Sequence, residues 1–274
     1  DILNSLGIQI YIHRDYNLPT LADKDSLVIC ISYSGNTEET VSALETAIDK
    51  KLKIVGIASG GKIEEICKKN NVPIVKIKAG IQSRMAVGQI FSALVKILEN
   101  SNIIDPISSE LPEVVKELET LNVSLEKEGE KLAKQIGEKI PVVYSSDTFR
   151  SVARIWKIKF NENTKIPAFY NVFPEVNHNE MVGYTKSKKD FFVIILQDSD
   201  DHPRTKKRMD LTAKLLSEKG IEVEILDFRK GSLLFKIFSS LLLGDWASYY
   251  LALENEVDPT PVEMVEEFKK LMEK

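Results

Sequence analysis

The stretch Leu27-Val28-Ile29-Cys30-Ile31, followed directly by Ser32-Tyr33-Ser34-Gly35-Asn36-Thr37-Glu38-Glu39-Thr40, decides the fold of this chain. Its first five residues are continuously apolar, which is typical of a parallel strand that is covered on both faces. After the polar loop, apolar residues recur with helical spacing at Val41, Leu44, Ala47 and Ile48. The order of strand, polar turn and helix predicts one unit of a parallel α/β fold.

The loop between this strand and this helix is crowded with hydrogen-bonding groups. Ser32, Ser34 and Thr37 supply three hydroxyls, and an amide and a glycine accompany them. Free N–H groups and the positive end of the helix dipole favour an anion at such a place. The loop therefore predicts a phosphate site, although a loop of this kind can also serve only as a helix cap. The carboxylates of Glu38-Glu39 would repel a phosphate unless they point to solvent.

Strand and helix signals alternate along the rest of the chain. In the first half we expect strands at 9–12, 27–31, 54–58 and 73–77, with helices at 38–50, 63–70 and 85–100. In the second half we expect strands at 141–145, 191–196 and 222–227, with helices at 149–161, 205–219, 233–253 and 262–274. The pattern predicts the α/β class, with two similar three-layer units on mainly parallel sheets. The expected domains are 1–104 and 140–274, joined by a helical segment at 105–139.

The bulk composition excludes several classes of partner. Among 274 residues, 37 are Lys or Arg and 41 are Asp or Glu, so the net charge of −4 gives no general attraction for nucleic acid. No apolar run is long enough to cross a bilayer and no signal peptide is visible, so we expect a cytoplasmic protein without a membrane partner. Cys30 and Cys67 are expected to be small buried residues. The chain begins at Asp1 without Met, and Asp1–Leu6 resembles the middle of a helix, so we expect residues ahead of it.

Two polar clusters in the second half hold candidate catalytic residues. His178 lies in Pro174-Glu175-Val176-Asn177-His178-Asn179, an expected loop, and is either part of a working cluster or a surface histidine. Glu162 lies in Phe160-Asn161-Glu162-Asn163, where the two asparagines are expected to stop a helix. It is either a base at the carboxyl edge of a sheet, where α/β folds place ligands, or part of a charged helix end.

Two further residues precede expected helices. Arg84 stands in a loop before an apolar helix, where it either caps the helix or places a positive charge beside a developing oxyanion. His202 precedes another helix and is expected to cap it.

The serine-rich loop is similar to the signature of the sugar isomerase (SIS) fold, and the chain resembles the bifunctional phosphoglucose/phosphomannose isomerases. Segments matching that family run in its order over almost the whole chain: Ser83-Arg84, Phe160-Asn161-Glu162-Asn163, Pro174-Glu175-Val176-Asn177-His178-Asn179, and Asp258-Pro259-Thr260-Pro261 followed by Lys269. The resemblance implies two SIS subdomains and an isomerase that interconverts glucose 6-phosphate and mannose 6-phosphate with fructose 6-phosphate through an enediolate. It implies no metal or organic cofactor, and a homodimer whose sites are shared between subunits.

The resemblance also implies roles for the residues that hold the phosphate, stabilise the intermediate and transfer the proton. The phosphorylated hexose would be held through its phosphate by Ser32, Ser34 and Thr37. The guanidinium of Arg84 would steady the enediolate, and the carboxylate of Glu162 would move the proton between C1 and C2.

The resemblance implies further roles for residues that assist ring opening or lie near the sugar. His178 would come from the neighbouring subunit and, with Lys269, assist ring opening, while Thr260 would lie near the sugar and be linked to acceptance of both C2 epimers. The family's Gly-Gly-Ser turn after its first strand is absent from this sequence. Two alternatives stay open: a non-catalytic SIS-domain sensor of sugar phosphates, and an isomerase of another phosphorylated sugar.

Overall fold

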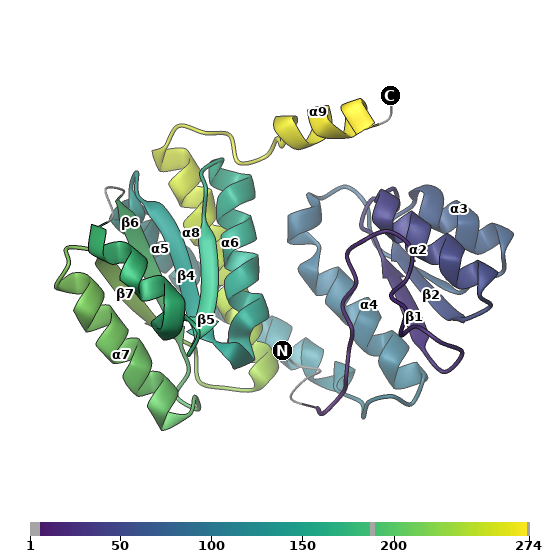
Figure 1. Cartoon of the computed structure of the whole chain (residues 1–274), viewed down its shortest axis with the longest axis horizontal. Coiled ribbons are helices and arrows are strands. Elements are labelled where there is room, and N and C mark those ends of the chain that lie inside the picture. Colours follow the sequence, from purple (N-terminus) through teal and green to yellow (C-terminus); the bar gives the residue numbers. More distant parts are fainter. Residues whose placement is uncertain (1–5, 187–189, 273–274) are drawn as a thin grey trace. The chain divides into compact units, whose positions relative to one another are not determined.

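A computed structural model describes residues 6–186 and 190–272 of the chain. They divide into two compact units: a first unit, Leu6–Glu110, and a second unit that begins at Leu111 and takes in the rest of the described chain (Figure 1). The helix expected around Asp1–Leu6 lies outside the described residues, apart from Leu6. Within the described residues, no helix combines the length and the apolar composition needed to cross a membrane.

The first unit is built on a parallel sheet with the order β1-β2-β3. Its elements are β1 (Leu27–Ile31), α2 (Glu38–Asp49), β2 (Lys53–Ala58), α3 (Gly61–Lys69), β3 (Ile74–Lys76) and α4 (Val87–Asn100). Leu44 of α2 and Cys67 of α3 pack with Cys30 on one face of the sheet. On the other face Ala93 of α4 packs with Ile57. Alternate residues of the strands thus face opposite helical layers, which explains the continuously apolar strand sequence.

The strand expected at 9–12 is wrong. Residues 8–14 contain no strand, and Ile10, Tyr11 and Ile12 are 42%, 61% and 63% exposed. A strand needs a neighbouring backbone to satisfy its N–H and C=O groups. In the described sheet, β1 pairs with β2 alone, so an apolar sequence at 9–12 is not enough to make a strand there.

The second unit is built on a parallel sheet with the order β5-β4-β6-β7. Its strands are β4 (Ile140–Ser146), β5 (Phe169–Phe173), β6 (Phe191–Gln197) and β7 (Glu222–Asp227), and its helices are α5 (Leu111–Ile136), α6 (Arg150–Thr164), α7 (Pro203–Ser217), α8 (Leu233–Glu254) and α9 (Glu263–Met272). Met209 and Leu216 of α7 pack on one face with Tyr144 and Val193, while α6 and α8 lie on the other (Figure 1). The α/β class with two three-layer units and parallel sheets is confirmed.

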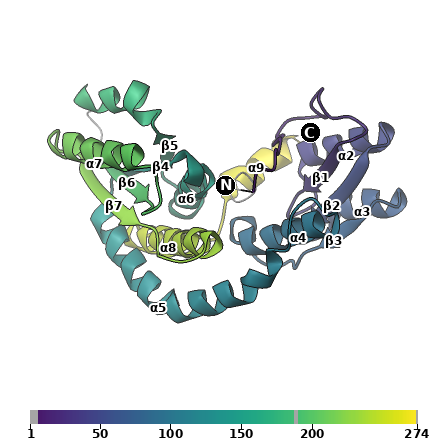
Figure 2. The ribbon, with the colours of Figure 1, turned by 90° about the horizontal axis from the view of Figure 1, so that it is seen from below.

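The long helix α5 lies alongside α8 in the second unit (Figure 2). Gly129 makes this approach possible, because a Cβ at that position would lie 2.5 Å from the Cβ of Trp246. The helix expected to connect two domains is therefore packed into the second of them. The sequence did not predict β5, nor the helical segment 176–186 that follows it.

Candidate active site

The serine-rich loop follows β1 at the carboxyl edge of the first sheet. The buried Oγ of Ser32 accepts hydrogen bonds from the N–H groups of Gly35 at 3.0 Å and Thr37 at 3.4 Å. It also lies 2.9 Å from Oγ1 of Thr37. Ser34 and Thr37 are exposed. Ser32 thus organises the loop from within, while Ser34 and Thr37 carry the hydroxyls that a bound anion can reach.

A second loop, between β2 and α3, is locked onto the first. The N–H of Ile63 donates to the carbonyl of Gly35 at 2.9 Å, and the N–H of Lys62 donates to Oδ1 of Asn36 at 3.0 Å. The serine-rich loop therefore caps the N-terminus of α3. Two backbone N–H groups in the first turn of α3 are thus already hydrogen-bonded within the protein.

The N-terminus of α2 at Thr37, unlike that of α3, has no side-chain cap within the described residues. The carboxylate of Glu38 accepts a hydrogen bond from the hydroxyl of Tyr16 at 3.0 Å, which raises the pKa of that phenol. Glu38 is exposed and held by Tyr16, which weakens the objection that it repels a phosphate. The start of α2 keeps its backbone donors for an anion.

Arg84 lies at the same edge of the first sheet. It belongs to the short helical turn Ser83–Met85 after β3, is buried, and its Nη1 donates to Oε1 of Gln82 at 3.5 Å. The hydroxyl of Tyr33 joins this region to the serine-rich loop, because it accepts from the N–H of Ile81 at 3.1 Å and donates to the carbonyl of Lys78 at 3.3 Å. The first unit thus gathers the following expected site residues at one edge: Ser32, Ser34, Thr37 and Arg84.

Glu162 lies in the last turn of α6, as expected for a residue at a helix end, whereas the alternative of a position at the carboxyl edge of the sheet is wrong. α6 starts at Arg150, just past the carboxyl end of β4, and returns toward the start of β5. Glu162 is twelve residues along this helix, about 18 Å at 1.5 Å per residue. A helix that connects two parallel strands must run back across the sheet, so its C-terminus lies at the amino edge.

The two asparagines beside Glu162 do not end the helix. α6 continues to Thr164, and its C-cap is Lys165, with a left-handed φ of 59°. Nδ2 of Asn161 donates to the carbonyl of Ile166 at 2.9 Å, and Nδ2 of the buried Asn163 donates to Oγ of Ser248 in α8 at 2.8 Å. These amides fix the turn that carries the half-buried Glu162.

Thr260 follows α8, whose end lies at the same amino edge. The N–H of Thr260 donates to Oδ1 of Asp258 at 2.8 Å, and this bond is the main reason that the pKa of Asp258 is lowered. Nζ of Lys165 donates to the carbonyl of Pro259 at 3.1 Å. The turn of Glu162 and the turn of Thr260 are therefore linked within the second unit. Lys269 lies on α9, where Nζ is 2.6 Å from Oε1 of Glu266.

His178 lies at the opposite end of the second unit from Glu162. It is in a π-helical turn, Val176–Glu180, directly after the carboxyl end of β5. The neighbouring Asn177 anchors this turn on α7, donating to Oγ1 of Thr212 at 2.7 Å and accepting from Arg208 at 3.3 Å. One unit therefore does not bring Glu162 and His178 together.

Glu180 closes the same turn and is a structural anchor. Its carboxylate accepts from the hydroxyl of Tyr144 and from Nδ2 of Asn171. The hydroxyls of Tyr144 and Tyr184 lie 2.7 Å apart. Burial raises the pKa of both phenols, that of Tyr184 to about 12, so both stay protonated and bonded at neutral pH.

At the carboxyl edge of the second sheet, one buried lysine pairs with two carboxylates. Nζ of the buried Lys236 lies 2.9 Å from Oδ1 of Asp198 and 2.6 Å from Oδ2 of Asp200. The hydrogen bond from Lys236 lowers the pKa of Asp200. In the second unit this edge thus carries an ion cluster in addition to the hydroxyls of Ser145 and Ser146, which end β4.

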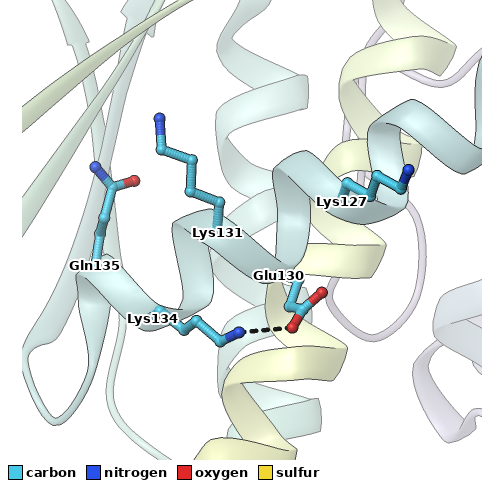
Figure 3. A pocket seen from close by; sticks show the side chains of 5 residues that line it. All are labelled: Lys127, Glu130, Lys131, Lys134 and Gln135. Atoms are coloured by element: carbon cyan, nitrogen blue, oxygen red, sulfur yellow. Dashed lines mark hydrogen bonds and ion pairs between the residues drawn. The ribbon is translucent and has the colours of Figure 1, made fainter.

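A shallow hollow on α5 carries no candidate chemistry. It is lined by Lys127, Glu130, Lys131, Lys134 and Gln135 (Figure 3). All five side chains come from one helix, and Lys134 pairs with Glu130 at 2.6 Å. None of them is an expected site residue, so the hollow is a charged helix surface.

Sequence reasoning gave no role to several residues that build the site. Tyr33 and Asn36 stand inside the quoted loop, and their side chains tie it to the loops around 81 and 62. Lys165 lies two residues after the end of the asparagine-rich motif. Their proximity to the motifs was the available signal, but their partners lie 26 to 94 residues away in sequence.

The fold and the site can be compared with known proteins. Residues 125–272 match the family described as the bacterial phospho-glucose isomerase C-terminal SIS domain. The chain resembles a solved structure, the C-terminal domain of glucosamine-fructose-6-phosphate aminotransferase from Francisella tularensis. The TM-score is 0.69 over 91% of this chain and 75% of that one, at 15% identity. Two parallel sheets, the serine-rich loop and these similarities define an SIS-fold protein of the sugar-isomerase class.

Curated relatives narrow the class to a family. The chain is 38% identical to the bifunctional phosphoglucose/phosphomannose isomerase of Caldicellulosiruptor bescii, over 98% of this chain and 82% of that protein. It is 29% identical to the D-glucosamine-6-phosphate 4-epimerase of Sulfolobus acidocaldarius, over 98% of this chain and 82% of that protein. The chain belongs to the family of bifunctional phosphoglucose/phosphomannose isomerases.

Proposed function

We propose that this chain is an aldose–ketose isomerase that interconverts glucose 6-phosphate and mannose 6-phosphate with fructose 6-phosphate. The observation that carries the proposal is the 38% identity to a bifunctional isomerase over 98% of the chain. The uncapped start of α2 beside the exposed hydroxyls of Ser34 and Thr37 supports a phosphate site. In this proposal Ser32, Ser34 and Thr37 hold the phosphate, and the binding energy of that remote group orients the sugar.

The proton transfer is assigned to Glu162. Isomerisation moves a proton between adjacent carbons of the open-chain sugar, and a carboxylate over the C1–C2 bond can take and return it. Glu162 is half-buried and its turn is fixed by Asn161 and Asn163, so it suits a group that must keep one position. The enediolate is negative, and the buried guanidinium of Arg84 is the group that would stabilise it.

Ring opening is assigned to His178 and Lys269, and the choice of C2 epimer to Thr260. Because His178 and Glu162 lie at opposite edges of one sheet, a site that uses both takes them from two subunits. We therefore propose a homodimer with shared sites. Further parts of the proposal are a cytoplasmic location and a role in carbohydrate metabolism, in glycolysis or gluconeogenesis.

The test is a coupled assay of fructose 6-phosphate formation from glucose 6-phosphate and, separately, from mannose 6-phosphate. We expect turnover of both substrates. Binding of either sugar phosphate without turnover would favour the alternative of a non-catalytic SIS-domain sensor.

A second candidate is an enzyme that acts on another phosphorylated sugar. The similarity to a D-glucosamine-6-phosphate 4-epimerase favours including glucosamine 6-phosphate in the substrate panel. Turnover of that sugar alone, with neither hexose 6-phosphate converted, would replace the main proposal by this one.

A further inference from the structure

Lys165 holds an unusual position at the end of α6. It follows the last helical residue, Thr164, and its backbone is left-handed with a φ of 59°. Its ammonium donates to three carbonyl oxygens, those of Glu162, Asn163 at 3.4 Å and Pro259 at 3.1 Å. One cation therefore connects the turn of Glu162 with the loop Asp258–Pro261.

Two of these three hydrogen bonds are ordinary for a helix C-terminus. A lysine near a helix C-terminus commonly bonds the last carbonyls, and its charge complements the helix dipole. That accounts for the carbonyls of Glu162 and Asn163. The carbonyl of Pro259 lies 94 residues further along the chain, so this third bond is a tertiary link.

The acceptor of this tertiary hydrogen bond, Pro259, is the residue directly before Thr260. The N–H of Thr260 is itself fixed by Oδ1 of Asp258 at 2.8 Å, and the charge of Lys165 also acts on the Asp258 carboxylate. A shift of the Lys165 ammonium would therefore move Thr260 relative to Glu162. Glu162 lies on α6, whereas Thr260 lies in the loop between α8 and α9.

We propose that Lys165 is a positioning residue that sets the place of Thr260 relative to Glu162 and thereby the preference between the two C2 epimers of the hexose phosphate. The inference rests on the proposed function. Glucose 6-phosphate and mannose 6-phosphate differ only at C2 and give the same enediolate. Discrimination must therefore come from how groups near C2 are placed relative to the base.

The experiment compares Lys165→Met, Lys165→Arg and the parent chain, with Lys157→Met as a control that removes a lysine from the same helix. Both replacement side chains at position 165 are unbranched, as lysine is, so the cost of the left-handed backbone there changes little. We expect kcat/KM for mannose 6-phosphate to fall at least fivefold relative to glucose 6-phosphate in Lys165→Met. Lys165→Arg should recover the parental ratio within twofold, and Lys157→Met should leave it unchanged.

A second measurement separates positioning from general damage. In a Thr260→Val background, Lys165→Met should no longer change the epimer ratio, because the proposed effect of Lys165 on that ratio depends on the Thr260 side chain. If Lys165→Met leaves the ratio of the two kcat/KM values unchanged, whether or not both values fall, the inference is overturned. Should Lys165→Met fail to fold, Lys165→Gln answers the same question. A parent chain that converts neither sugar would overturn the proposed function, whereas an active parent with an unaltered ratio overturns only the role of Lys165.

Discussion

At the scale of single residues, the chemistry of the proposed site depends on how each charged side chain is held. Glu162 is half-buried in a turn fixed by two asparagine amides, whereas Lys269 is exposed and pairs within its own helix. Arg84 is buried beside the loop that carries the hydroxyls. Fixed groups can stabilise a transition state without first reorganising, so Glu162 and Arg84 are the residues on which turnover should depend most.

Replacing Glu162 by Gln should abolish proton transfer while keeping the size of the side chain. General base catalysis contributes about 10²–10⁴-fold, so we expect kcat to fall by a factor in that range. KM should change by less than about threefold, since the phosphate is held elsewhere. Steady-state kinetics on glucose 6-phosphate measure both quantities. Glu138→Gln, an exposed change in the same unit, is the control, and full activity of Glu162→Gln would remove this residue from the mechanism.

The carboxylate of Glu99 should make the stability of the fold depend on pH. The N–H of Ser108, Nζ of Lys96 and the N–H of Ile107 donate to its carboxylate, and these bonds lower its pKa from 4.5 to about 2. Because the pKa is lower in the folded chain, the carboxylate stabilises the fold above pH 4.5 and loses that contribution as pH falls toward 2.

The matching experiment follows Tm as a function of pH for the parent and Glu99→Gln. The variant should melt at a lower temperature at pH 7, and the gap should close between pH 4.5 and pH 2. Glu65→Gln, an exposed change in the same unit, should have the same Tm as the parent at pH 7 and throughout the acid range. A gap that stays constant down to pH 2 would contradict the assigned cause.

At the scale of elements, the proposed phosphate site depends on two interlocked loops. The serine-rich loop caps α3 through Asn36 and the carbonyl of Gly35, and it leaves the start of α2 without a side-chain cap among the described residues. Gly35 has a φ of 74°, and a Cβ there would lie 1.8 Å from the carbonyl oxygen of Gly60. Neither loop can keep its position if Gly35 carries a side chain.

Gly35→Ala should therefore damage both stability and phosphate binding. We expect a lower Tm and a KM for glucose 6-phosphate raised at least tenfold, with a smaller effect on kcat. Gly220→Ala is the matched control, because Gly220 has a φ of 81° but nothing within 4 Å of its Cβ position. That variant reports the backbone strain alone, of about 1 kcal/mol. Equal KM values for the two variants would show that the loops are not coupled.

At the scale of the whole molecule, the two edges of the second sheet carry different catalytic candidates. Glu162 ends the helix that returns to the amino edge, and His178 follows β5 at the carboxyl edge. The sheet between them is rigidly packed, so no small movement inside the unit brings them together. A site that needs both groups requires two chains.

Mixed dimers test this consequence. Glu162→Gln and His178→Ala chains should each be weakly active, and dimers formed from the two should regain activity at the one site that combines both intact groups. Different affinity tags allow the hybrid to be isolated and its activity compared with each parent variant. Purified hybrids without recovered activity would contradict the shared site.

The sequence predicted most of the fold because its periodic patterns are local. Continuous apolar runs at 27–31 and 191–196 and helical spacing at 38–50 and 233–253 reflect faces that must be buried, and the structure contains the corresponding elements. The weakly patterned β5, with Phe169 51% exposed, escaped prediction, and the apolar segment 9–12 was mistaken for a strand. In both cases the deciding factor was the presence or absence of a neighbouring strand, which lies far away in sequence.

By itself the sequence determined the kinds of groups available and their order: a hydroxyl-rich turn after a buried strand, an asparagine-flanked glutamate, and a histidine in a polar segment. Each is set by neighbours within a few residues, so local rules suffice. Only the tertiary structure decided that Ser32 faces inward, that Glu162 and His178 lie at opposite ends of one sheet, and that Lys165 reaches Pro259. Those outcomes depend on strand order, helix direction and contacts between distant segments, which no local pattern encodes.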